Sequence, residues 1–140
     1  MKKSTILILL ILTTFFCISC NSKSDVERVK SEFEKLNIKM TDNFKILEFN
    51  CSGLSDYTLD FELLTDSTNF SRISEFITNQ SGFFIGDTTD NVELFNNHPY
   101  IKNNQLFWEQ YTPTDISYGY RRIKADIETK IVKYHFLDER

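Results

Sequence analysis

The sequence predicts one α+β domain over residues 24–140, an antiparallel sheet of about five strands with two helices packed on one face. Two segments carry apolar residues at the helical spacing, and five segments alternate apolar with polar residues as strands do. The strands follow one another with short connections, which favours antiparallel hairpins and gathers the helices on one face.

The first helix is expected over residues 24–37. Ser24 stands three residues before Glu27, the spacing of a capping box, in which each side chain accepts a hydrogen bond from the other residue's backbone N–H. The apolar residues that follow at helical spacing form one stripe, which consists of Val26, Val29, Phe33 and Leu36.

The first hairpin is expected to join residues 45–51 to residues 57–64. In the second of these segments, apolar residues alternate with Thr58, Asp60 and Glu62. One register places the apolar side chains of both strands on the same face, and it pairs Cys51 with Tyr57, Phe49 with Leu59, and Leu47 with Phe61.

A second helix is expected over residues 65–79, where Thr65 and Asp66 provide a polar start. Glycine, proline, asparagine and aspartate then indicate turns over residues 80–104, and residues 83–85 and 92–95 are candidates for short strands. The apolar stripe of the helix consists of Phe70, Ile73, Phe76 and Ile77.

The last three strands are expected at residues 105–111, 120–128 and 131–137. A turn at Thr129 and Lys130 lacks the Gly or Asn that tight turns prefer, so a wider loop is the alternative. The expected register pairs Ile127 with Val132, Ala125 with Tyr134 and Ile123 with Phe136, and it sets Asp126 opposite Lys133.

Aromatic residues near the connection between residues 105–111 and 120–128 form a candidate partner surface. If Tyr111 lies opposite Tyr118, Leu106 and Trp108 are buried beside Ile123, Ala125 and Ile127, and Phe107 lies on the outer face. A slip of one residue would exchange the two faces, and the competing interpretation is that the aromatic rings are core. The residues predicted to form a partner-binding patch are Tyr111, Tyr118 and Tyr120.

The N-terminus has the organisation of an export signal. Two lysines precede an apolar run that is too short to span a bilayer, and the run ends in a C-x-x-C pair, Cys17 and Cys20. A redox pair would need a strand before it and a helix after it, and a zinc site would need a second pair of ligands. Cys51, His98 and His135 do not have that spacing, so neither site is favoured.

The end of the apolar run resembles the lipobox of bacterial lipoprotein signal peptides. Ile18, Ser19 and Cys20 fit the pattern, and Cys17 stands where leucine is usual. The resemblance implies cleavage between Ser19 and Cys20 and attachment of diacylglyceryl to the Cys20 sulfur. It also implies acylation of the new amino terminus, for example with palmitate.

Such processing would divide the chain into a signal peptide (residues 1–19), a lipidated cysteine with a short tether (residues 20–23) and the domain at residues 24–140. Two or more acyl chains hold a protein stably, so we expect a lipid-anchored membrane protein of the cell envelope. Asn21, rather than aspartate, follows the lipidated position, which by the family's rule favours the outer membrane where two membranes are present. The alternative is an ordinary signal peptide that releases a soluble protein.

Charge excludes some partners. Loss of the signal peptide would remove Lys2 and Lys3 and move the formal net charge from −4 to −6. Arg121 and Arg122 are the only adjacent basic residues after the signal peptide. We therefore expect no nucleic-acid partner, and we expect membrane contact to come from the lipid rather than from basic side chains.

No catalytic motif, metal site or cofactor site is recognised in the sequence. Cys51 is expected to be a buried thiol outside any disulfide, because Cys17 is removed and Cys20 carries lipid. His98 is expected in a turn and His135 on the outer face of the last strand. An acidic turn lacks the EF-hand spacing of calcium ligands, and it contains Asp87, Asp90, Asn91 and Glu93.

The sequence therefore predicts an envelope lipoprotein that is not an enzyme and that acts as a binding or support module. A protein or polymer partner would lie on a sheet face. The first alternative is an inhibitor or immunity-type protein that blocks one dedicated protein partner. The second is a hydrolase with an unrecognised site, which a deep polar cleft containing histidine and carboxylates would favour.

Overall fold

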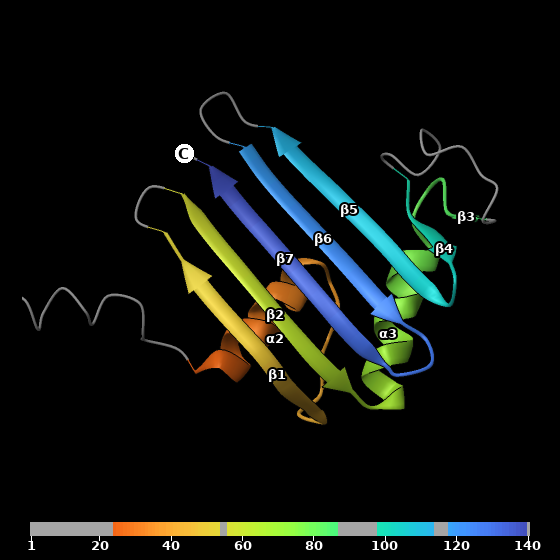
Figure 1. Ribbon diagram of the computed structural model, residues 1–140, viewed down its shortest axis with the longest axis horizontal. Coiled ribbons are helices and arrows are strands. Elements are labelled where there is room, and N and C mark those ends of the chain that lie inside the picture. The colour runs from red at the N-terminus through yellow and green to blue at the C-terminus, as the bar shows by residue number, and fades with distance from the viewer. Residues whose placement is uncertain (1–23, 54–55, 87–97, 114–117, 140) are drawn as a thin grey trace, which may run out of the picture.

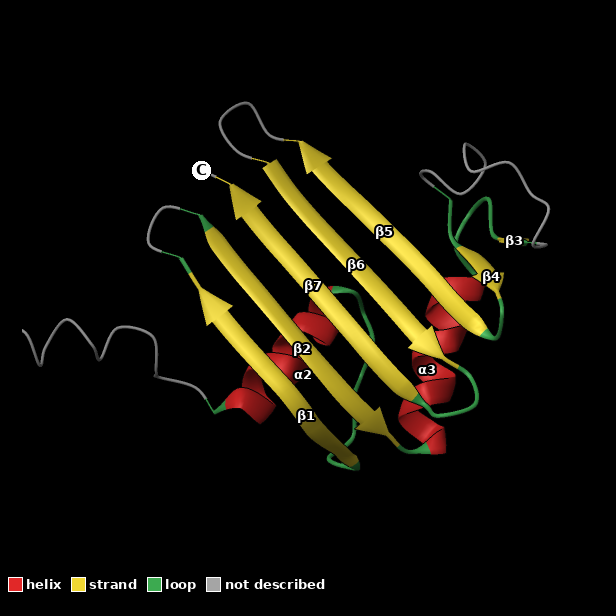
Figure 2. Cartoon of the chain, in the orientation of Figure 1, coloured by secondary structure: helices red, strands yellow, loops and turns green. Residues whose placement is uncertain are grey.

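A computed structural model describes residues 24–53, 56–86, 98–113 and 118–139. Within these residues the chain forms one seven-stranded sheet, and both helices lie on the same face of it (Figures 1 and 2). The α+β class and the single domain are confirmed. The expected count of about five strands is wrong, because two further short strands extend the sheet.

Helix α2 (Asp25–Lys35) has the predicted capping box. The Glu27 amide donates to Ser24 Oγ at 3.3 Å, and the Ser24 amide donates to Glu27 Oε2 at 3.2 Å. The helix ends in a Schellman motif, because Asn37 takes a left-handed φ of 60° and the Ile38 amide bonds to the Phe33 carbonyl. Three members of the predicted stripe are buried, and Val26 is exposed.

Strands β1 (Phe44–Ser52) and β2 (Tyr57–Thr65) form the predicted hairpin in a different register. Cys51 lies opposite Leu59 and Phe49 opposite Phe61, two residues from the expected pairs. A slip of two residues keeps each side chain on its face, so the alternation cannot detect it. An irregularity between Ile46 and Glu48 also turns Leu47 outward, so its expected core position is wrong.

Helix α3 (Ser67–Thr78) begins two residues later than the start of the expected range, because Thr65 ends β2 and Asp66 is the N-cap. Phe70, Ile73 and Ile77 are buried as their spacing predicts. The helix packs against the sheet beside α2.

Strands β3 (Phe84–Ile85) and β4 (Tyr100–Lys102) pair in parallel, so the sheet is mixed and the expectation of a purely antiparallel sheet is wrong. The candidate strand at residues 83–85 is present as β3, and the candidate at residues 92–95 lies outside the described residues. Strands of two and three residues are too short for a period-two pattern, which is why β4 was not foreseen.

Strands β5 (Gln105–Pro113), β6 (Tyr118–Asp126) and β7 (Ile131–Glu139) are antiparallel, and both of their registers differ from expectation by two residues. Ile127 belongs to the turn and is exposed, so its expected core position is wrong. The observed partners are Tyr111 with Tyr120, Trp108 with Ile123, Ala125 with Val132, and Lys124 with Lys133.

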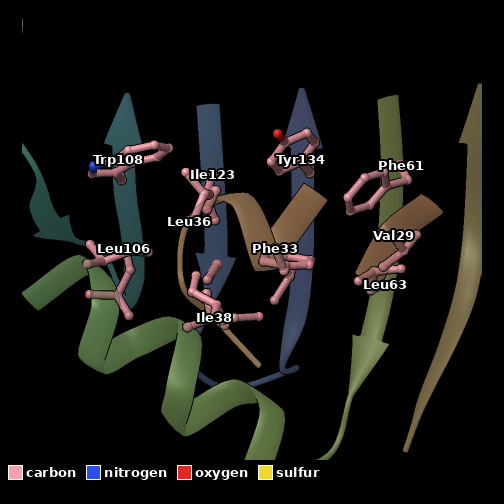
Figure 3. Packing of buried hydrophobic residues seen from close by; sticks show 14 of the residues in the cluster. Val29, Phe33, Leu36, Ile38, Phe61, Leu63, Leu106, Trp108, Ile123 and Tyr134 are labelled. Atoms are coloured by element: carbon pink, nitrogen blue, oxygen red, sulfur yellow. The ribbon is translucent and has the colours of Figure 1, made fainter. Parts of the chain in front are cut away.

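The strand order is β1-β2-β7-β6-β5-β4-β3, so β7 lies between the two hairpins. The core fills the space between the sheet and the helices, as Figure 3 shows. The Phe33 ring lies 5.9 Å from the Phe61 ring and 5.8 Å from the Tyr134 ring. Leu106 and Trp108 are buried on this face as predicted. The opposite face of the sheet is left uncovered by the two helices (Figure 2).

Candidate functional site

The uncovered face of the sheet, which we call the open face, carries most of the chemistry of the described residues. Strand pairing aligns its side chains into two rows that run across the strands. The first row consists of Asn50, Asp60, His135, Arg122 and Glu109. The second row consists of Glu48, Glu62, Lys133, Lys124, Phe107 and Tyr100.

Each row contains an ion pair between neighbouring strands. Lys133 Nζ lies 2.7 Å from Glu62 Oε2, and Arg122 Nε lies 2.7 Å from Glu109 Oε1. The hydrogen bond and the negative charge of Glu62 raise the pKa of Lys133 above its ordinary value. Each of these pairs is partly exposed, so each contributes at most about 1 kcal/mol to stability.

A histidine–aspartate pair lies at the centre of the open face. His135 Nδ1 is 2.5 Å from Asp60 Oδ1, and the ring of Tyr120 lies 5.7 Å from the ring of His135. His135 was predicted on the outer face and is there. Its partner Asp60 was not foreseen, because β2 and β7 are far apart in sequence and their pairing has no local signal.

Lys124 differs from the other cations of the open face. It lies directly opposite Lys133, and its Nζ is 5.2 Å from the centre of the Phe107 ring. Among the described residues no carboxylate forms an ion pair with it. Asp126, on the same strand, is occupied in the β6–β7 turn, where Oδ1 accepts from the amides of Thr129 and Glu128 at 2.9 and 3.1 Å.

The charged residues surround an open depression of about 410 Å³. A second depression of about 360 Å³ adjoins it, and Glu62, Lys124 and Lys133 line both. The polar side chains around the first are Glu48, Asn50, Asp60, Glu62, Arg122, Lys124, Lys133 and His135.

This arrangement offers groups of both charge signs for binding, and it also contains a histidine beside carboxylates. A histidine with carboxylates is present, as the hydrolase alternative would require, and acid–base chemistry at His135 is chemically accessible. The lining of the depression, however, contains no serine, threonine or cysteine that His135 could activate. The depression is also open rather than a deep cleft, so a substrate would remain largely in water.

Two of the three predicted tyrosines lie on the open face. Tyr111 is 47% exposed, whereas Tyr120 is only 8% exposed, and their rings are 4.8 Å apart. The guanidinium of Arg122 lies over the Tyr120 ring at 5.3 Å. Burial, followed by the charge of Glu109, raises the pKa of Tyr120. The backbone of Tyr118 pairs with Pro113 and Glu139, and its side chain lies outside the described part.

An aromatic ladder, formed by Phe84, Tyr100 and Phe107, lies beside Lys124 on β3, β4 and β5. The ring of Tyr100 lies 5.7 Å from that of Phe84 and 4.6 Å from that of Phe107, and both pairs are stacked. The faces of Tyr100 are therefore covered by its neighbours, and burial raises its pKa. Phe84 was not predicted as a site residue, because it joins this ladder only through the parallel β3–β4 pairing.

Two other predicted residues, Cys51 and His98, do not belong to the two rows of the open face. Cys51 is half-buried rather than buried, and its Sγ accepts a hydrogen bond from Arg28 Nη1 at 3.4 Å, a positively charged neighbour that the sequence did not indicate. Burial and then the Cys51 side chain raise the pKa of Tyr57 to about 12. His98 lies exposed in a bend. Cys20, Ser19 and the acidic turn at residues 87–93 lie outside the described residues.

The described residues contain neither a candidate metal site nor a candidate membrane-spanning helix. No group of three histidine, cysteine, aspartate or glutamate side chains in this part of the chain is placed to hold a metal ion. None of the helices in this part is long and apolar enough to cross a bilayer. Comparisons with protein-family models, with curated proteins and with solved structures gave no significant match.

Proposed function

We propose that the protein is a lipid-anchored module of the bacterial envelope that binds a partner protein on its open face. The observation that carries this proposal is the combination on that face of two charged rows, an open depression and an aromatic ladder. Aromatic and arginine side chains are enriched where proteins bind one another, and polar groups form the rim around them.

The alternation of charge favours a protein partner over a polymer. Along the first row, Asp60 and Glu109 lie on either side of His135 and Arg122, and along the second row Glu62 lies beside Lys133. A polymer with repeating negative charge would meet these carboxylates at short range and be repelled. A folded protein can present charges of both signs in a complementary pattern.

The position of α2 is consistent with an anchor at the β1 edge. Arg28, near the start of α2, bonds to Cys51 near the end of β1, and the helix begins beside that edge (Figure 1). The three residues between Cys20 and Ser24 span about 10–14 Å when extended. A lipid on Cys20 would therefore hold the β1 edge near the bilayer and leave β5, four strand spacings or about 19 Å away, accessible.

Site-specific photocrosslinking in native membranes of the source bacterium tests the proposal. A photoreactive residue at Asn50 or Tyr111 samples the open face, and one at Arg72 or Glu75 samples the exposed surface of α3 as the matched control. We expect one adduct of defined mass from the open-face positions and little from the α3 positions. No adduct from the open face, or equal adducts from both surfaces, would overturn the proposal.

A further inference from the structure

Most basic side chains of the open face already have a carboxylate neighbour. Lys133 contacts Glu62, Arg122 contacts Glu109, and His135 contacts Asp60. Lys124 is the exception among the described residues of this face that line the depression. Its charge therefore needs a separate explanation.

The position of Lys124 is unfavourable for the stability of the isolated domain. It lies directly opposite Lys133 on the neighbouring strand, where Cβ atoms are about 5 Å apart and like charges are destabilising. Its side chain is also half-buried, which removes part of its hydration. The nearby Phe107 ring at 5.2 Å gives partial compensation through a cation–π contact, but a ring does not neutralise the charge.

We propose that Lys124 is the docking point for one acidic side chain of the partner protein. This inference rests on the proposed function and names the chemistry of the contact. The carboxylate would lie between Lys124 and Lys133, in the space where the two depressions meet. Apolar groups next to the acidic residue would lie against the edges of the aromatic ladder that begins at Phe107.

The surroundings favour a single carboxylate rather than a group of higher charge. Glu62 already contacts Lys133, and Asp126 lies two residues from Lys124 on the same strand. The amide and hydroxyl bonds from Thr129 and the bond from Gln105 keep the pKa of Asp126 below its ordinary value, so it remains ionised. With Glu62 paired to Lys133, the two lysines together offer about one unit of positive charge, and Asp126 lowers the local potential further, so a group of higher negative charge would be repelled.

The first experiment examines Lys124 without a partner. The purified full-length protein in neutral detergent is treated with an amine-acylating reagent, and the rate is read at each lysine by mass spectrometry. Propionate, which carries the single carboxylate of a glutamate side chain, should slow acylation of Lys124 several-fold. Propionamide and sodium chloride at equal ionic strength should not, and the exposed Lys39 should be unaffected throughout.

Two results of this experiment would overturn the inference. One is the absence of protection of Lys124 by propionate. The other is protection by inorganic polyphosphate without protection by propionate, which would indicate a polyanionic polymer as the ligand.

The second experiment repeats the photocrosslinking with Lys124→Gln and with Lys39→Gln, which makes the same charge change on the helix side. We expect the adduct to fall about tenfold with Lys124→Gln and to persist with Lys39→Gln, with thermal midpoints of both variants no lower than that of the unsubstituted protein. An undiminished adduct with Lys124→Gln would overturn this inference and leave the proposed function standing. Absence of any open-face adduct from the unsubstituted protein would overturn both.

Discussion

Asn69 is a fully buried amide whose hydrogen bonds attach a loop to helix α3. Its Oδ1 accepts from the Thr41 amide at 2.8 Å, and its Nδ2 donates to Thr41 Oγ1 at 3.0 Å and to the Asn43 carbonyl at 3.2 Å. Nothing in the local sequence marks this residue, because its partners lie 26–28 residues earlier. It is a structural residue that only the tertiary arrangement reveals.

Asn69→Ala should therefore destabilise the protein by about 1–3 kcal/mol, because it leaves the half-buried Thr41 amide without its partner and removes the bonds that attach the loop to α3. The midpoint of urea-induced unfolding measures this change in stability. Asn79→Ala is the control, since that side chain is exposed at the end of α3, and it should change stability by less than about 0.5 kcal/mol. Equal effects of the two substitutions would contradict this account.

Tyr134 is a buried tyrosine whose ionisation makes the free energy of unfolding depend on pH in the alkaline range. Its hydroxyl donates to Glu32 Oε2 at 2.9 Å, and burial, followed by the charge of Glu32, raises its pKa. In the unfolded chain the tyrosine ionises near pH 10, whereas in the folded chain it stays protonated. The folded state then binds more protons, so this contribution to stability is present below about pH 10 and is lost as the pH rises above it.

For Tyr134→Phe we expect the fall in unfolding free energy above about pH 10 to be shallower by up to about 1.4 kcal/mol per pH unit. The variant should also be less stable near neutrality, because Glu32 loses a buried donor. Urea unfolding between about pH 8 and pH 11 measures both effects. Phe33→Leu, a core change without a titrating group, should lower stability equally across this range, and an unchanged slope in Tyr134→Phe would refute the assignment.

At the scale of elements, the β6–β7 turn explains why the hairpin does not adopt the register expected from sequence. Asp126 accepts hydrogen bonds within the turn instead of pairing with Lys133, and Lys130 takes a left-handed φ of 56°. A non-glycine residue in this conformation is strained. The turn is therefore wider than Thr129 and Lys130 alone, which was the alternative considered from the sequence.

Lys130→Gly should stabilise the protein by up to about 1 kcal/mol, because glycine adopts positive φ without a steric penalty. The gain is reduced by loss of the exposed bond from Lys130 Nζ to Ser67 Oγ. Thr129→Gly, at a residue without positive φ, should destabilise instead. Thermal unfolding compares the two variants, and destabilisation by Lys130→Gly would show that the turn is not strained there.

From the sequence, the type of each long element and the face that it buries were easier to predict than the residues with which each strand pairs. Capping and apolar stripes are local, so both helices were predictable, as was the burial of Trp108. Registers were each wrong by two residues, because side chains repeat with a period of two and alternation cannot detect such a slip. The open face required the pairing of β2 with β7, so the contact between Asp60 and His135 could not be predicted.

At the scale of the whole molecule, the proposed attachment to a membrane would depend on Cys20, which is outside the described residues. Cys20→Ala should abolish fatty-acid labelling and leave the unprocessed chain, because the sulfur that would carry the lipid is absent. Metabolic labelling with a fatty acid measures the lipid attachment, and the mass of the product measures the cleavage. Cys17→Leu, which restores the residue usual at that place in the lipobox, should preserve both, and normal cleavage of Cys20→Ala would contradict lipidation.

The central place of β7 has a consequence for how the chain folds during synthesis. β1–β2 and β5–β6 can each form as a local hairpin, but they join only through β7, which pairs with β2 on one side and β6 on the other. Contacts such as Leu59 with Phe136 connect residues far apart in sequence, and such contacts form slowly. The two halves of the sheet therefore stay separate until residues 131–139 have been made. A chain threaded outward in the N-to-C direction would cross the membrane before its sheet could close.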